Sequence, residues 1–176
     1  MSGHSKWSTI KHKKAALDAK RGKVFGKLAQ LIAVESRLAG GDVNSPSLKV
    51  VIDKAKAANM PKENIERAVA KGIGGGAGEL EHITYELYGP GGVAMLIDTL
   101  TDNRNRTVSE LKHLISKLGY QLAEPGAASW AFEKKGADWE PTTTTPLEDG
   151  DVEKLSGLVD AIEEHDDVQQ VYTNAE

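Results

Sequence analysis

The sequence predicts an α+β protein in which an N-terminal three-helix bundle precedes a mainly antiparallel sheet domain with two helices. Two observations carry this prediction. Apolar residues recur at helical spacings of three and four before residue 72, and they alternate with polar residues, as in a half-buried strand, after residue 78. The charge changes sign at the same place: residues 1–71 hold 15 Lys and Arg against 6 Asp and Glu, whereas residues 72–176 hold 7 against 20.

Three amphipathic helices are predicted in the first half. Residues 15–39 carry an apolar stripe that ends at Gly40 and Gly41. Ser45 and Pro46 are typical of an N-cap followed by the first helical residue, and Pro61 starts a third helix over residues 61–71. The short connections favour a small bundle. Residues 1–14 show no apolar period, so we expect them to form an extended arm.

A Gly-rich hinge is predicted over residues 72–78 (GIGGGAG), which sets the domains at 1–71 and 79–176. Residues 83–88 and 93–100 flank the turn at 89–92 and predict an antiparallel pair of strands. A helix capped by Thr101 or Asp102 is expected to end at Gly119. Short strands are predicted at 120–122 and 128–132, an acidic helix at 152–164 and a final strand at 168–172.

Composition and motifs argue against an enzyme. The chain has no cysteine, no apolar run of about 18 residues and no secretory signal core, so we expect a cytoplasmic protein without a membrane partner. No GxSxG, P-loop or kinase motif occurs, and GIGGGAG follows a helix, the reverse of a dinucleotide loop. We therefore expect no catalytic residue, metal, cofactor or small-molecule substrate. The histidines show no metal-ligand spacing: His4, His12, His82, His113 and His165.

The densest positive charge lies between residues 6 and 27, where only Asp18 opposes it. Such a segment is typical of polyanion binding, with affinity that falls steeply with salt. Trp7 is expected to stack on an exposed base or sugar; the alternative is a solvated lysine-rich face with Trp7 packed against the bundle. The predicted nucleic-acid-binding residues of this segment are Lys6, Trp7, Lys11, His12, Lys13, Lys14, Lys20, Arg21, Lys23 and Lys27.

A second candidate site is the sequence TDNRNRT at residues 101–107. Arg104 and Arg106 fall in the first turn of a predicted helix, where positive charge opposes the helix dipole at a cost of roughly 0.3 to 1 kcal/mol each. An anionic ligand held by both guanidinium groups and the free backbone N–H groups would compensate. The alternative is that both arginines pair with carboxylates such as Glu110 or those of the acidic C-terminal helix.

Four segments resemble the YebC/PmpR family, which includes the mitochondrial translational activator of cytochrome oxidase. They are SGHSKWSTIKHKKAALDAKRGKVFGKL, NMPKENIERAVAKG, YELYGPGGVAMLIDTLTDNRNRT and DDVQQVYTN, and the resemblance extends over nearly the whole chain. It implies an N-terminal helical bundle followed by α/β domains, without a cofactor or catalytic site. It also implies a regulator of gene expression: bacterial members are described as DNA-binding, and some members act on ribosomes stalled at proline-rich stretches.

The sequence departs from this family in one place. Typical members carry a further α/β domain between WAFEKKG and PTTTTPLEDGD, which are joined here almost directly through residues 137–140. Because the flanking segments would still be adjacent strands, we expect the second domain to keep its fold.

Two functions remain open from the sequence. One is a DNA-binding transcriptional regulator, which the resemblance favours. The other is a ribosome-associated translation factor that binds rRNA or tRNA, which suits an arm without a recognition helix because RNA is irregular in shape. A third class, a protein-interaction module built on the acidic domain, leaves the basic arm without a role.

Overall fold

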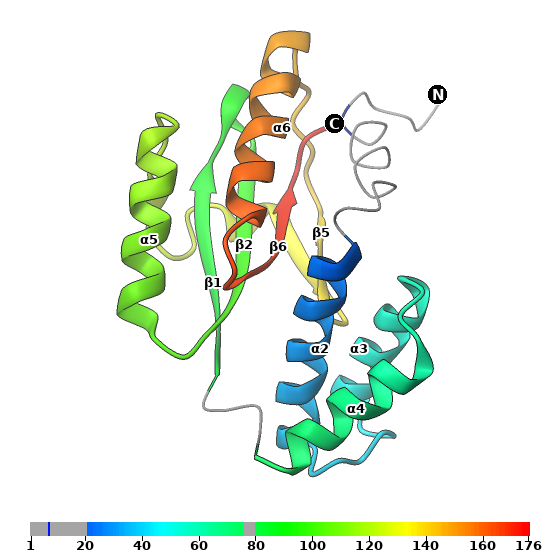
Figure 1. Ribbon diagram of the computed structural model, residues 1–176. Coiled ribbons are helices and arrows are strands. Elements are labelled where there is room, and N and C mark those ends of the chain that lie inside the picture. Colours follow the sequence, from blue (N-terminus) through cyan, green and yellow to red (C-terminus); the bar gives the residue numbers. More distant parts are fainter. Residues whose placement is uncertain (1–6, 8–20, 76–79) are drawn as a thin grey trace, which may run out of the picture. The chain divides into compact units, whose positions relative to one another are not determined.

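The computed structural model describes residues 7, 21–75 and 80–176 (Figure 1). The described residues form two compact units. The helical unit holds residues 21–75 and Leu80, and the sheet unit holds residues 81–176 together with Trp7. The expected α+β organisation, with a three-helix part followed by antiparallel sheets and two helices, is confirmed.

The helical unit consists of α2 (Arg21–Leu38), α3 (Pro46–Ala57) and α4 (Lys62–Ile73). Pro46 begins α3 and Pro61 precedes α4, as their fixed φ and missing N–H favour. The apolar stripes of the three helices face inward, which supplies the hydrophobic stabilisation of this unit. Its fully or nearly fully buried side chains include Leu28, Ile32, Val34, Leu48, Val51, Ala55, Met60, Ile65 and Ala68.

Helices α2 and α4 approach each other closely because small residues lie between them. A Cβ atom added to Gly72 would lie 2.3 Å from the carbonyl oxygen of Ala33 and 2.8 Å from the Cβ of Ser36. Ser36 is buried and its Oγ donates a hydrogen bond to the carbonyl of Val69 at 2.8 Å. Gly72 and Ile73, predicted as the start of the hinge, are the last residues of α4, and residues 76–78 of that hinge lie outside the described residues.

The sheet unit is built on a four-stranded sheet in the order β3-β1-β2-β6. Its strands are β1 (Glu81–Tyr88), β2 (Ala94–Thr101), β3 (Leu122–Ala123) and β6 (Val168–Thr173), and all neighbours are antiparallel. Helices α5 (Arg104–Lys117) and α6 (Asp149–Glu163) cover one face (Figure 1). Met95 and Ile97 of β2 point to that face and join a core with Leu111 of α5 and Leu155 of α6.

The opposite face of the sheet receives a smaller layer. Alternate residues of β2, Ala94 and Leu96, pack there with Phe132 and Tyr172. This layer comprises the 3-10 turn η3 (Ser129–Ala131) and the hairpin of β4 (Phe132–Lys135) and β5 (Asp138–Pro141). The predicted strand over 128–132 is thus mostly a turn, and the strand expected at 120–122 pairs only at Leu122–Ala123.

Candidate nucleic-acid interface

Most of the predicted basic arm lies outside the described residues: Lys6, Lys11, His12, Lys13, Lys14 and Lys20. Arg21 is the first residue of α2, and Lys23 and Lys27 are partly exposed on the same helix. Lys13, Lys20 and Lys27 are spaced by seven residues, the spacing that places side chains on one flank of a helix. Their role in binding therefore stays a prediction.

The helical unit is basic also in its described part. Residues 21–75 contain ten Lys and Arg against five Asp and Glu. Since its core is apolar, this charge lies on the surface, where α3 exposes Lys49 and Lys56 and α4 exposes Lys62, Arg67 and Lys71. Sequence reasoning did not single these residues out, because acidic residues alternate with them and the density of charge is lower than in the arm.

Trp7 lies in the hydrophobic core of the sheet unit, with 8% of its surface exposed. Its ring belongs to the same cluster as Leu87, Val93 and Ile97. The expectation that Trp7 stacks on a base does not agree with this burial, because a base has no access to the ring. The alternative prediction, that Trp7 packs against the helical bundle, is also wrong, because the ring lies in the sheet unit. The expectation of an extended arm over residues 1–14 is also wrong at this position, because residue 7 is helical and joins a core. An isolated Trp in a polar segment gives no sequence signal for the surface that it joins.

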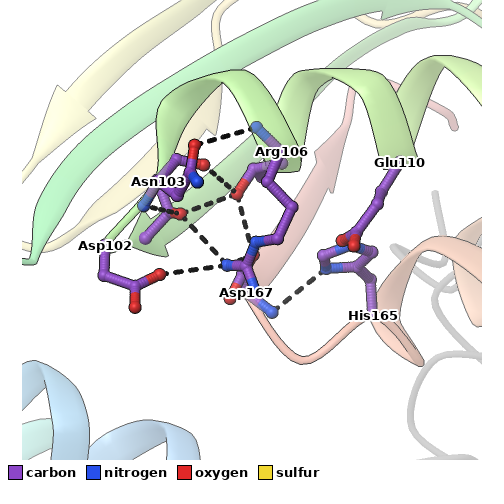
Figure 2. A network of polar contacts seen from close by, with 8 residues as sticks. Asp102, Asn103, Arg106, Glu110, His165 and Asp167 are labelled. Atoms are coloured by element: carbon purple, nitrogen blue, oxygen red, sulfur yellow. Dashed lines mark hydrogen bonds and ion pairs between the residues drawn. The ribbon is translucent and has the colours of Figure 1, made fainter.

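The first turn of α5 is held by a polar network around Arg106 (Figure 2). Asn103 caps the helix, in place of the predicted Thr101 or Asp102, and its Oδ1 accepts a hydrogen bond from the backbone N–H of Arg106 at 3.1 Å. The Arg106 Nη2 lies 2.7 Å from Asp167 Oδ2 and 3.2 Å from Asp102 Oδ1. Thr107 Oγ1 donates to the same Asp167 oxygen at 2.8 Å. This network ties the end of β2 and the start of α5 to the turn between α6 and β6.

His165 extends this network to the second turn of α5. Its Nδ1 accepts a hydrogen bond from the backbone N–H of Asp167 at 3.1 Å, so in the neutral ring the proton is on Nε2, which contacts Glu110 Oε2 at 2.7 Å. Glu110, His165 and Asp167 each offer a ligand atom within 4.8 Å of the others, a spacing that a metal ion can bridge. Arg106 already supplies positive charge to Asp167. The spacing of Glu110, His165 and Asp167 in the sequence gave no sign that they lie together.

Arg104 pairs with a different carboxylate. Its Nε and Nη2 both donate to Glu81 Oε2, at 3.1 and 2.8 Å, and these hydrogen bonds raise the pKa of the guanidinium. The alternative that both arginines pair with carboxylates agrees with this geometry, although the partners are Glu81, Asp102 and Asp167. Glu110, the partner named from the sequence, binds His165 instead. An anion at this end of α5 would have to displace these carboxylates.

The fold therefore defines a two-unit α+β protein with a basic helical unit and an acidic sheet unit. Residues 5–75 match the family model described as the TACO1/YebC protein N-terminal domain, and residues 80–137 and 137–175 match that of the TACO1/YebC second and third domain. The chain belongs to the TACO1/YebC family.

Several relatives carry the name "Probable transcriptional regulatory protein". That of Trichlorobacter lovleyi is 50% identical over 182 residues, covering 98% of this chain and 70% of the relative. That of Desulfitobacterium hafniense is 56% identical over 138 residues, covering 77% of this chain and 55% of the relative. A conserved hypothetical protein of Aquifex aeolicus, Aq1575, has a crystal structure with a TM-score of 0.79 and 36% identity, covering 98% of this chain and 97% of that one.

The chain is shorter than many of these relatives. It is 42% identical to the protein of Pelotomaculum thermopropionicum over 241 aligned positions that cover 100% of this chain and 99% of the other. Its own 176 residues leave 65 of those positions without a counterpart. The two matches to the second family model meet at residue 137, which lies in the turn between β4 and β5. This position agrees with the predicted place of the missing segment.

Within the part of the chain that the structure describes, none of the helices has the length and apolar character needed to cross a lipid bilayer.

Proposed function

We propose that this protein regulates gene expression by binding DNA through the basic arm and the basic face of its helical unit, as a cytoplasmic transcriptional regulator without enzymatic activity. The observation that carries the proposal is the separation of charge. The described helical unit holds ten basic residues against five acidic, whereas residues 81–176 hold seven against nineteen. A polyanion is attracted to the first surface and repelled by the second.

The names of the relatives support the regulatory part of this proposal, since they are called probable transcriptional regulatory proteins. Arg104 and Arg106 take a secondary place in it, because their guanidinium groups are engaged by carboxylates of the same unit. The basic residues of the arm and the exposed lysines of α3 and α4 are the primary contacts, whereas the buried Trp7 is not one of them.

A ribosome-associated factor that binds rRNA or tRNA, and that relieves stalling at proline-rich stretches, is the second candidate. One observation favours it: the exposed face of α4 alternates Lys62 and Arg67 with Glu63 and Glu66. Acidic side chains in the first turns of a helix oppose its insertion into the major groove of DNA, where base edges are read. Irregular RNA can be held through phosphate contacts without such insertion.

The experiment compares binding to duplex DNA and to purified ribosomes over a salt series. The test variant changes Lys11, Lys13, Lys14 and Lys20 to Glu, and the control variant makes the same change at four lysines of the sheet unit. Losing four phosphate contacts makes the negative slope of log K against log salt shallower by roughly 3 to 4 for duplex DNA. The control lysines are Lys112, Lys117, Lys134 and Lys154.

Binding to duplex DNA that depends on the arm and on DNA sequence supports the transcriptional role. Tight arm-dependent binding to ribosomes, with weak DNA binding that shows no sequence preference, supports the translational role instead. Equal losses in the test and control variants would contradict both, because binding would then follow net charge alone.

A further inference from the structure

Trp7 attaches the chain to the sheet unit before the helical unit begins. Its ring exposes 8% of its surface and packs in the core that also holds Leu87, Leu111 and Ile162. Arg21, the next described residue, begins α2 of the helical unit. Along the chain, the helical unit is therefore inserted between two parts of the sheet unit, Trp7 and the segment that starts with β1.

The lysines proposed to bind nucleic acid lie in the stretch between these two attachment points. Residues 8–20 hold four lysines, at positions 11, 13, 14 and 20, and one acidic residue, Asp18. The stretch follows a side chain buried in the sheet unit and continues into α2. This part of the basic arm is therefore attached to folded protein at both of its ends.

Attachment at two points lowers the entropy that the arm loses on binding. A chain with one attached end samples more conformations than a chain with both ends held, so it loses more when a ligand orders it. The difference scales roughly as the 3/2 power of the number of residues, which gives a factor of about 50 for the 13 residues of this stretch. The burial of Trp7 restricts the arm during folding, before nucleic acid binds.

We propose that Trp7 is a positioning residue of the nucleic-acid interface: its burial attaches the basic arm to the sheet unit and so raises the affinity of the arm for nucleic acid, without a contact of its own. The inference rests on the proposed function, because it concerns the same lysines. A purely structural tryptophan would instead change the stability of the sheet unit and leave binding by the folded protein unchanged.

The test measures binding of the full chain to a DNA duplex over a salt series, at a temperature at which circular dichroism shows each variant to be folded. Trp7→Ala should lose roughly three- to tenfold in affinity, since the attachment at α2 retains part of the effect. Its slope of log K against log salt should equal that of the wild type, because no phosphate contact is removed. Trp7→Phe, which keeps a buried aromatic ring, should retain most of the affinity.

Two further variants separate the attachment from stability. Leu111→Ala is the matched control, because Leu111 is fully buried in the same core and its truncation lowers stability to a similar extent without removing the attachment. A Gly-Ser insert after Ser8 that doubles the length of the stretch changes no described residue of either unit. It should lower the affinity roughly two- to threefold.

Equal affinities of Trp7→Ala and Leu111→Ala would overturn the proposal, and so would tighter binding by Trp7→Ala or an insert without effect. A shallower salt slope in Trp7→Ala would contradict it as well, since phosphate contacts would then have been lost. The proposed function fails on a different result, in which the variant with Lys11, Lys13, Lys14 and Lys20 changed to Glu binds DNA as tightly as the wild type.

Discussion

Replacing Glu86 by Gln should destabilise the sheet unit although the side chain keeps its shape. The carboxylate accepts three backbone hydrogen bonds, two of them on Oε2. An amide oxygen can keep those two as neutral bonds, each weaker by about 1 kcal/mol, while its NH2 group would face the N–H of Gly126. Adding the lost third bond, which contributes about 1.5 to 3 kcal/mol with a charged acceptor, gives a decrease in the free energy of unfolding of about 3 to 5 kcal/mol near neutral pH.

The effect should depend on pH in a defined direction. Burial alone would raise the pKa of Glu86, but the hydrogen bonds from Gly126, Ala128 and Ser129 outweigh it and the pKa is lowered. A lowered pKa contributes stability above the pKa of the unfolded chain, about 4.3, and that contribution is lost as the pH falls through the lower folded value. The difference between wild type and Glu86→Gln should therefore be constant above about pH 5 and shrink below about pH 4.

Urea unfolding followed by tryptophan fluorescence measures this effect selectively, because Trp7, Trp130 and Trp139 all belong to the sheet unit. Glu133→Gln is the control: Glu133 is an exposed partner of Lys135 at 3.2 Å, and such pairs contribute roughly 0 to 1 kcal/mol. A difference for Glu86→Gln that is no larger than that of the control, or that persists unchanged at acid pH, would refute the role given to this carboxylate.

Three further changes test the packing of the two units. Gly72→Ala should lower the stability of the helical unit by about 1 to 3 kcal/mol, because the new Cβ meets the Ala33 carbonyl. Urea unfolding followed by circular dichroism measures this change. The control is Gly26→Ala, whose Cβ meets open space, so that it should be neutral or stabilising. Trp7→Ala should lower the stability of the sheet unit by about 3 to 5 kcal/mol, and an effect below about 1 kcal/mol would show that the ring is not part of its core. Arg106→Ala should destabilise that unit, by fluorescence, more than Arg104→Ala, since Asp167 is largely buried and Glu81 is exposed.

Much of the fold follows from local patterns. The apolar stripes of α3 and α4 and the alternation along β1 are each visible in a short window of sequence. The start of α5 is visible only approximately, because the sequence predicts a cap at Thr101 or Asp102 and the cap is Asn103. The end of α4 is not, because the helix continues through Gly72 and Ile73, and the glycine is required there by packing: α2 lies too close for any side chain. Pattern reasoning reads the glycines after Lys71 as a linker, since it has no information about the neighbouring helix.

For the candidate site, the sequence predicts which half of the chain is basic but not which residues pair with one another. Positive charge in the first half is a property of the sequence, but the partners of Arg104 and Arg106 come from residues 81 and 167, which only the fold brings near α5. The same holds for Glu86, which reads as an ordinary exposed strand residue until the turn at 126–129 folds over it. Buried and paired charges depend on long-range contacts, whereas exposed charge densities do not.

The hairpin of β4 and β5 explains how a shorter chain keeps the fold of longer relatives. Lys135 and Asp138 are paired in register, so the two strand ends lie only about 5 Å apart and are closed by Gly136, with a φ of 63°, and Ala137. The hairpin is anchored without any inserted segment, because Tyr172 donates a hydrogen bond from its hydroxyl to Asp138 Oδ1 at 2.9 Å and packs with Phe132. A domain inserted at this turn needs only adjacent termini and leaves both anchors in place. Any activity of the relatives that resides in their additional segment is therefore separable from this fold and has to be tested in this chain directly.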